Sequence, residues 1–330
     1  MHTKEASAEM STFMDFCSGI GAGRLGLELN GLHCVGHSEI SSTSEATYRL
    51  FFDNDTTNYG DLMLIDPYEL PDFDMMVAGF PCQTFSIAGK RAGFEDERGN
   101  IIYGLIKILR HKRPITFLLE NVKGLVNHDK GRTFKIIQEE LLKSGYTIFS
   151  SVLNSADYGV PQQRERIYIV GFRDDLGVDQ FLFPRHLDGN KRLEELLVPM
   201  PHQRFDEKGE TFNRYLTNKY NEGRIKFDDL VSEDYTVIDT RHSDLRIYRD
   251  ATPTLRTGRH GILYALDGTL WKLSGIEALQ LQGFRDEEVS KFVRTPVVSN
   301  NVLLSQAGNA MTVNVIQAIG RQMLETIKKN

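Results

Sequence analysis

The sequence has little cysteine and no long apolar run. Its three cysteines, Cys17, Cys34 and Cys82, leave one unpaired under any pairing and include no C-x-x-C spacing, which argues against a disulfide framework and a zinc site. No stretch approaches the roughly 20 apolar residues needed to cross a bilayer, and the polar start of the chain lacks the apolar core of a signal peptide. We therefore expect free thiols, no metal, no membrane segment and a cytoplasmic location.

The chain also lacks an excess of positive charge. Its formal net charge is −6 over 330 residues, which gives no overall sign of nucleic-acid binding. Positive charge is instead gathered locally, because residues 241–260 carry five arginines but only two acidic side chains. This run predicts a modest basic patch, although a solvated arginine-rich surface gives the same pattern.

Repeats and low-complexity tracts are absent, and the length suits one large domain with a smaller second one. Four short apolar runs predict strands, at residues 12–16, 75–78, 116–119 and 167–170. Helical spacing over 101–109 and 133–142 predicts helices between them, and this alternation is typical of a doubly wound, largely parallel sheet. From about 183 to 284 the sequence becomes polar, which predicts a second module, and the tail from 313 to 327 recovers helical spacing.

A glycine-rich turn follows the first predicted strand and precedes a helical segment. Such a turn lets the backbone approach a nucleotide-like cofactor at the open edge of a sheet. The spacing Gly21-x-Gly23-x-x-Gly26 also satisfies the dinucleotide-binding expression, so these residues alone leave a nicotinamide-dependent dehydrogenase open. Glu39 ends the next apolar segment, residues 33–37, and can accept hydrogen bonds from a ribose under either interpretation, although a lone glutamate is more often a surface carboxylate.

Cys82 lies in the segment Gly79–Ser86, directly after the predicted strand at 75–78. The end of that strand is the edge at which a doubly wound fold builds its site, and a helix start beyond it would favour a thiolate. Because proline and polar residues flank it, we interpret Cys82 as a candidate nucleophile. Cys17 and Cys34 are interpreted as small buried hydrophobic residues.

A thiolate that attacks a heterocyclic base needs an acid to neutralise the charge that develops on the ring. Glu120 follows the third predicted strand and should lie at the same sheet edge as Cys82. Arg164 and Arg166 precede the strand at 167–170, and strand alternation would send both to one face. One carboxyl group and two guanidinium groups then converge near one thiol, although Glu–Arg pairs also commonly tie strand ends together.

Together these segments resemble the motif series of the bacterial DNA cytosine-5 methyltransferases. In chain order the matching segments are Asp15–Gly21, Gly60-Asp61, Gly79–Gln83, Glu120-Asn121-Val122, Gln162–Arg166, Arg249–Gly258 and Gln306–Ala310. The resemblance runs from about Phe13 to Ile327 and is missing only between roughly 183 and 240. A dehydrogenase would leave the candidate nucleophile, acid and arginine unexplained, so the dinucleotide expression is a by-product of extra glycines.

The resemblance implies a Rossmann-like α/β fold of the methyltransferase type, with a mixed, mostly parallel sheet and a smaller target-recognition domain. Residues 1–185 would form the catalytic domain that binds S-adenosyl-L-methionine, 186–290 the target-recognition domain, and 291–330 a C-terminal segment that returns to the catalytic domain. Double-stranded DNA is the implied substrate. A monomeric enzyme is implied as well, in a restriction-modification setting where a cognate restriction endonuclease acts on the same site.

The same resemblance assigns catalytic roles. Cys82 would attack carbon 6 of a cytosine extruded from the duplex, which makes carbon 5 nucleophilic enough to take a methyl group from the sulfonium. Glu120 would bind the ring nitrogen and amino edge, Arg166 would hold the carbonyl oxygen, and Arg164 would support the loop or a phosphate. The carbon 5 proton and the thiol would then leave.

Binding residues are implied in the same way. The implied cofactor-binding residues are Cys17, Ser18, Gly19, Ile20, Gly21, Glu39, Ile40, Asp61, Leu62, Pro81, Ile101, Asn309 and Ala310. The implied DNA contacts are Ser86, Arg98, Arg241, Arg246 and Arg256. The chain departs from the family at Cys17, where a phenylalanine that packs on the adenine is usual.

Two other functions share part of this pattern. A tRNA cytosine-5 methyltransferase uses the same chemistry, but such relatives usually carry Pro-Pro-Cys-Gln where this chain has Phe80-Pro81-Cys82-Gln83. A DNA-binding module without catalysis would not need Cys82, Glu120 and Arg166 together. The target sequence itself is not readable, because recognition residues in the unmatched stretch follow no transferable code.

Overall fold

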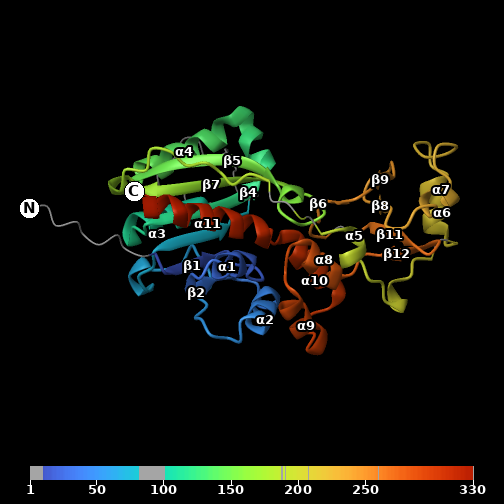
Figure 1. Cartoon of the computed structure of the whole chain (residues 1–330), viewed down its shortest axis with the longest axis horizontal. Helices are drawn as coiled ribbons and strands as arrows, with labels where there is room; N and C mark the ends of the chain where they lie inside the picture. Colours follow the sequence, from blue (N-terminus) through green and yellow to red (C-terminus); the bar gives the residue numbers. More distant parts are fainter. Residues whose placement is uncertain are drawn as a thin grey trace, which may run out of the picture. The chain divides into compact units, whose positions relative to one another are not determined.

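The computed structural model describes residues 10–81, 101–186, 189, 191–206, 208–258 and 260–329. The chain divides into two compact units, whose elements are labelled in Figure 1. The first unit comprises Met1–Leu153, Glu165–Arg185 and Met311–Asn330, and the second comprises Asn154–Arg164 and His186–Ala310. Within the described ranges, no helix is both long and apolar enough to cross a membrane.

A six-stranded sheet forms the centre of the first unit, in the order β2-β1-β3-β4-β7-β5. Its strands are β1 (Thr12–Phe16), β2 (His33–Ser38), β3 (Met75–Gly79), β4 (Thr116–Val122), β5 (Tyr146–Asn154) and β7 (Glu165–Arg173). β1 pairs in parallel with β2 and β3, and β3 pairs in parallel with β4, whereas β7 runs antiparallel to β4. The predicted mixed, mostly parallel α/β sheet is therefore confirmed.

Helices cover both faces of this sheet (Figure 1). They are α1 (Ala22–Glu28), α2 (Ser42–Phe51), α3 (Ile101–Lys112), α4 (Arg132–Lys143) and α11 (Val313–Lys329). Met14 and Phe16 of β1 join an apolar cluster to which α3 and α4 contribute, whereas α1 contacts β2 and β3 and packs on α11. A Cβ at Gly26 would lie 2.7 Å from the side chain of Ile316 in α11. Gly26, the last glycine of the dinucleotide expression, is thus a helix-packing residue.

The strand boundaries follow the sequence prediction closely at the centre of the sheet. The strand predicted at 12–16 coincides with β1, and β3 and β4 begin where predicted but end later, at Gly79 and Val122. The longer β4 places Glu120 inside the strand, not after it. β5 was not predicted from the sequence. Most of its residues after Tyr146 are half-buried or exposed, so they do not form the continuous apolar run by which the other strands were recognised.

The second unit contains a four-stranded antiparallel sheet, in the order β12-β11-β8-β9, and a short parallel pair, β10-β6. Its strands are β6 (Gln162–Gln163), β8 (Val237–Asp239), β9 (Arg246–Tyr248), β10 (Thr252–Pro253), β11 (Ile262–Leu266) and β12 (Thr269–Lys272). Its helices are α5 (Leu193–Leu196), α6 (Glu210–Leu216), α7 (Phe227–Leu230), α8 (Gly275–Leu281), α9 (Asp286–Arg294) and α10 (Asn300–Asn309). Phe212 of α6 and Leu230 of α7 form a small apolar cluster with Ile238 and other buried residues of the four-stranded sheet.

Candidate active site

The turn between β1 and α1 is built on left-handed backbone angles. Cys17, Gly19 and Gly21 have φ values of 51°, 56° and 86°. A Cβ at Gly21 would lie 2.2 Å from Cε2 of Phe52, so only glycine fits there, whereas a Cβ at Gly19 would meet nothing within 4 Å. The Ser18 hydroxyl is buried and has no hydrogen-bond partner among the described residues. The turn is therefore closely packed at Gly21 and open at Gly19, where a ligand can approach the backbone.

Glu39 stands at the end of β2 and is fixed to this turn. Its carboxylate accepts the backbone N–H of Gly19 at 2.8 Å. The hydroxyl of Ser38 donates to the carbonyl of Gly60 at 2.7 Å, which ties the end of β2 to the residue before Asp61. The structure thus brings together three segments that the sequence assigned to cofactor binding: the glycine turn, Glu39 and Gly60-Asp61.

Two titratable groups beside the turn are shifted by burial. Burial raises the pKa of the Cys17 thiol to about 12, and the negative charges of Glu39 and Asp15 add to this shift. Burial also raises the pKa of Asp15 to about 8, against the opposing hydrogen bond from the backbone N–H of Arg24. At neutral pH Cys17 is therefore a neutral thiol and a poor nucleophile.

The carboxyl ends of β3 and β4 form the second part of the site. Gly79 at the end of β3 lies opposite Glu120 of β4 in the parallel register. The side-chain amide of Asn121 donates to the carbonyl of Phe80 at 2.8 Å and so holds the chain as it leaves β3. Pro81 is the last described residue of this segment. Three residues that the sequence assigned to the site lie outside the described residues: Cys82, Ser86 and Arg98.

Glu120 forms an ion pair with Arg166 of the neighbouring antiparallel strand β7. Nε of Arg166 lies 3.2 Å from Oε1 of Glu120, and the two side chains are 12% and 9% exposed. Because little water reaches the pair, each charged group fixes the position of the other. The acid and the arginine that the sequence assigned to binding the base are therefore side by side.

Arg164 belongs to the second unit, not to the strand that carries Arg166. β7 begins one residue after it, so strand alternation does not apply, and the expectation that alternation sends both arginines to one face is corrected. The guanidinium of Arg164 is buried, with 2% of the residue exposed, and it donates to the carbonyls of Leu255, Gly308 and Ala310. These are the contacts of a side chain that holds backbone segments together.

The other residues assigned to the cofactor fall in both units. Leu62 is buried and Ile101, at the start of α3, is half-buried, and both pack in the apolar cluster of the first unit. Ile40 is 76% exposed, so its side chain is available to cover a ligand. Asn309 is exposed and Ala310 is buried, at the end of α10 in the second unit. Of the remaining assigned residues, Ile20 is buried, and Asp61 and Pro81 are exposed.

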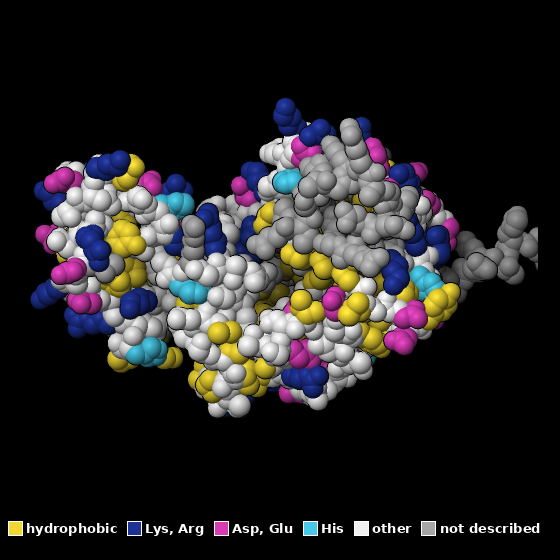
Figure 2. All heavy atoms as spheres, turned by 180° about the vertical axis from the view of Figure 1, so that it is seen from behind, with side chains coloured by type: hydrophobic (Ala, Val, Ile, Leu, Met, Phe, Trp, Pro, Cys, Tyr) yellow, Lys and Arg dark blue, Asp and Glu magenta, His cyan; other side chains and the backbone are white. Residues whose placement is uncertain are grey.

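The three described arginines assigned to DNA differ in what holds them. Arg241 makes two hydrogen bonds to Asp239, both 2.7 Å long, and its side chain is 2% exposed. Burial acts to raise the pKa of Asp239, but the hydrogen bonds from Arg241 outweigh it and leave that pKa below its ordinary value. Arg246 lies 3.6 Å from Asp244, and both Arg246 and Arg256 are exposed. On the face drawn in Figure 2, Lys and Arg side chains are interspersed with Asp and Glu.

Two contributors to this geometry were not predicted from the sequence. Asn121 holds the segment that leaves β3, and its sequence signal is its place beside Glu120. Phe52 closes the glycine turn from the end of α2. Nothing in the sequence marks Phe52, because its partner Gly21 is distant in the chain.

Comparison with known proteins places this geometry in a family. Residues 11–325 match the family model of the C-5 cytosine-specific DNA methylase. The Type II methyltransferase M.NgoBI of Neisseria gonorrhoeae is 37% identical over 309 residues, which cover 92% of this chain and 90% of the relative. The Type II methyltransferase M.HaeII of Haemophilus aegyptius is 36% identical over 324 residues, which cover 95% of this chain and 93% of the relative.

The fold is shared with solved methyltransferase structures. One is a protein described as a DNA modification methyltransferase encoded within an E. coli prophage, with a TM-score of 0.70 at 18% identity, covering 96% of this chain and 99% of that one. The order of the sheet, the glycine turn after β1 and Glu120 near the end of β4 fit the class of α/β methyltransferases. The chain belongs to the C-5 cytosine-specific DNA methylase family, and it is a DNA cytosine-5 methyltransferase.

Proposed function

We propose that this enzyme transfers the methyl group of S-adenosyl-L-methionine to a cytosine extruded from a specific duplex sequence, with Cys82 as covalent nucleophile. The observation that carries the proposal is the Glu120–Arg166 pair at the end of β4. Gly79 lies opposite Glu120, and Asn121 holds the carbonyl of Phe80. The chain segment that leads to the cysteine therefore leaves the sheet beside a buried acid.

Each member of this group has a chemical task. The target base must leave the stack, because carbon 6 is inaccessible to a thiol inside the duplex. The Cys82 thiolate forms a bond to carbon 6, and the electron pair of the 5,6 double bond moves toward carbon 5 and the ring. Glu120, which must carry a proton when the base is bound, donates that proton to the ring nitrogen and so neutralises this charge, and Arg166 donates to the carbonyl oxygen. After methyl transfer, a base removes the carbon 5 proton and the thiolate leaves.

The glycine turn fits a nucleoside cofactor with a charged amino-acid end. Gly19 offers open backbone, Ser18 has a buried hydroxyl without a partner among the described residues, and Glu39 presents a carboxylate beside them. Ser18 to Gly21 would hold the methionine end, Glu39 the ribose hydroxyls and Asp61 the adenine amino group. When bound, S-adenosyl-L-methionine supplies an electrophilic methyl group on a sulfonium.

We propose further that residues 186–290 read the DNA sequence and that the enzyme acts as a monomer. Ser86, Arg98, Arg246 and Arg256 are the proposed contacts to DNA. A nuclease with the same site specificity is the proposed biological partner, because the relatives are named Type II methyltransferases. Arg241 is paired with Asp239 and its side chain is 2% exposed, so it can meet DNA only through the N–H groups that this pair leaves unused.

The first test is methylation in cells. Bisulfite sequencing of a plasmid from cells that express the chain should show protected cytosines at one recurrent site. Cys82→Ser should abolish this protection, while Cys34→Ala, which alters a buried thiol in β2, should retain it. Normal protection in the Cys82→Ser cells would remove the covalent mechanism.

The second test traps the covalent complex. With S-adenosyl-L-methionine present, a duplex with 5-fluorocytosine at the protected position should form a denaturant-stable adduct with the wild type, because fluorine cannot leave as a proton does. The adduct should be absent with Cys82→Ser, although that variant still binds the duplex. Trapping on 5-fluorocytosine tRNA but not on the duplex would assign the chemistry to RNA.

A further inference from the structure

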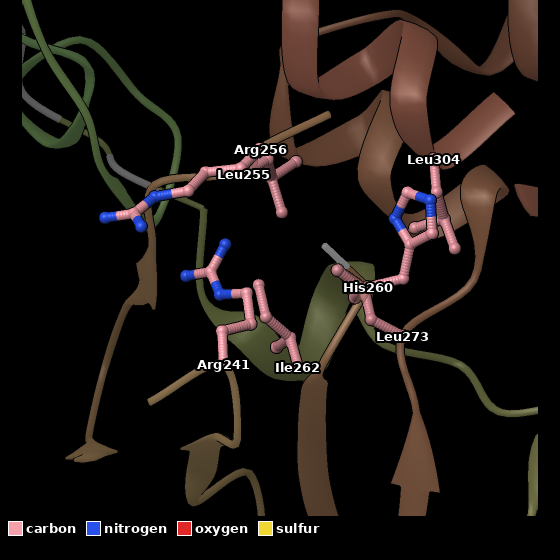
Figure 3. A pocket seen from close by; sticks show the side chains of 7 residues that line it. All are labelled: Arg241, Leu255, Arg256, His260, Ile262, Leu273 and Leu304. Carbon is pink, nitrogen blue, oxygen red and sulfur yellow. The ribbon is translucent and has the colours of Figure 1, made fainter. Parts of the chain in front are cut away.

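A pocket in the second unit carries two arginines at its polar end. Its lining residues are Arg241, Leu255, Arg256, His260, Ile262, Leu273 and Leu304. Figure 3 shows the guanidinium groups of Arg241 and Arg256 on one side of the pocket, with His260 across from them beside Leu304. The other side chains that line it are apolar. The pocket therefore has a cationic end and an apolar wall.

Hydrogen bonds on three nitrogens hold the guanidinium of Arg241 in place at this pocket. Its Nε and Nη2 donate to the carboxylate of Asp239, and its Nη1 donates to the carbonyl of Thr254 at 2.9 Å. A guanidinium has five N–H groups, so two remain without a partner in the part of the chain that the structure describes. The buried ion pair holds the guanidinium in one orientation beside the pocket that Arg241 lines.

The backbone that carries Arg256 is held by hydrogen bonds at Leu255 and by close packing against Gly308. The preceding residue, Leu255, is held at both of its backbone groups. Its carbonyl accepts a hydrogen bond from Nη1 of Arg164 at 3.2 Å, and its N–H donates to Oε1 of Gln162 at 3.1 Å. A Cβ at Gly308 would lie 2.6 Å from the carbonyl carbon of Arg256, so the backbone packs directly on α10. The Arg256 side chain itself is exposed and makes no hydrogen bond or ion pair within the described ranges.

The charges at this end of the pocket add to a single positive charge, because Asp239 offsets one of the two guanidinium groups. Burial lowers the pKa of His260, and its Nε2 lies 3.1 Å from the hydroxyl of Ser305, so it adds no charge at neutral pH. We infer that this pocket binds one phosphodiester group of the DNA strand between Arg241 and Arg256, with the adjoining sugar against the apolar wall. A phosphodiester carries one negative charge, which matches the site.

The inference rests on the proposed function, in which DNA is the substrate. Its test distinguishes failure of the pocket to bind DNA from failure of the enzyme to methylate it. The probe is a short duplex that contains the site found by bisulfite sequencing, and the measurement is its dissociation constant as a function of salt. Each phosphate contact contributes about 0.9 to the slope of log affinity against log salt. Arg256→Gln should weaken binding by about tenfold and lower that slope by about one.

Two matched variants control this experiment. Arg294→Gln removes the same charge from an exposed position at the end of α9, outside the pocket, and should leave the slope unchanged. Arg256→Lys keeps the charge and should keep the slope. An equal slope change for Arg256→Gln and Arg294→Gln would show an effect of net charge alone and would overturn the inference.

Neutral methylphosphonates placed one at a time along each strand locate the contact. At one position the substitution should weaken wild-type binding about as much as Arg256→Gln does, and should cost that variant nothing further. Additive effects at every position would also overturn the inference. If bisulfite sequencing finds no methylated cytosine, the proposed function fails, and the salt slopes of the wild type, Arg256→Gln and Arg294→Gln, measured on a duplex of arbitrary sequence, still decide the pocket.

Discussion

The resemblance to the family motif implies that Cys17 takes a position at which a phenylalanine that packs on the adenine is usual. Its thiol is neutral at physiological pH, because burial raises its pKa to about 12. It packs against the same apolar cluster as Tyr59 and Val35. A thiol covers less of an adenine face than a ring does, so we expect a neighbour to compensate, either Phe80, which is 3% exposed, or Ile40, which is 76% exposed.

We expect Cys17→Phe to leave the affinity for S-adenosylhomocysteine unchanged or to raise it, by up to about tenfold, since stacking on a base contributes on the order of 1–3 kcal/mol. Cys17→Ala should lower the affinity only slightly. Calorimetric titration measures both. A large loss of affinity in the phenylalanine variant would mean that the pocket has been repacked around the smaller side chain.

At the scale of elements, Arg24 joins α1 to the end of α2. Its guanidinium makes hydrogen bonds of 2.8 and 2.6 Å to Asp55 and one of 2.8 Å to Glu28. It also lies 4.1 Å from the ring centroid of Phe52, the ring that closes the turn at Gly21. The cation–π contact therefore fixes the wall of the glycine turn from behind.

Arg24→Met should lower the free energy of unfolding by about 1–3 kcal/mol, because charged hydrogen bonds are lost from a buried position. The affinity for S-adenosylhomocysteine should fall as well, since Phe52 loses the contact that positions it. Arg49→Met is the matched control: it removes an exposed arginine of α2 that pairs with Glu45, and should change stability by less than about 1 kcal/mol. Denaturant titration and calorimetry report the two effects. Reduced stability with unchanged affinity would show that the turn does not depend on Arg24.

The sequence predicted those strands that are short, continuous runs of buried apolar residues, because such a run is visible without knowing its partners in the fold. β1, β3 and β4 are buried runs at the centre of the sheet, and their starts were predicted to the residue. β5 was missed because it is half-buried, and the antiparallel pairing of β7 with β4 depends on a partner far away in the chain.

The site residues differ in the same way: those fixed by a local pattern were predicted, and those fixed by residues far along the chain were not. Glu120 and Arg166 were expected to lie close together, and they do, because each belongs to a strand that the sequence located. Arg164 was misplaced, because its hydrogen-bond acceptors Gly308 and Ala310 lie far along the chain and no spacing rule reaches them. Local patterns therefore predict the strands that carry Glu120 and Arg166, but not the long-range contacts that hold the surrounding backbone.

At the scale of the whole molecule, neither unit is a continuous stretch of chain. The first unit is closed by its last segment, Met311–Asn330, which contains α11. This helix buries five large apolar side chains: Val313, Val315, Ile316, Ile319 and Met323. Each contributes about 1.5–3 kcal/mol when buried, so α11 supplies on the order of 10 kcal/mol. That is comparable with the entire stability of a typical domain.

A chain that ends at Ala310 should therefore fail to form a cooperative first unit, although it retains all six strands of the sheet and residues through the end of α10. Without α11, the face of α1 at Gly26 loses the side chain of Ile316 and is exposed to water. We expect the truncated chain to show no cooperative thermal transition in near-ultraviolet circular dichroism and no protection of β1 and β3 amides from hydrogen exchange. A chain that ends at Ile327 keeps every buried residue of α11 and should melt within a few degrees of the full chain. Cooperative unfolding of the chain that ends at Ala310, close to the full-length midpoint, would show that α11 is dispensable and that the sheet is stabilised by its other helices alone.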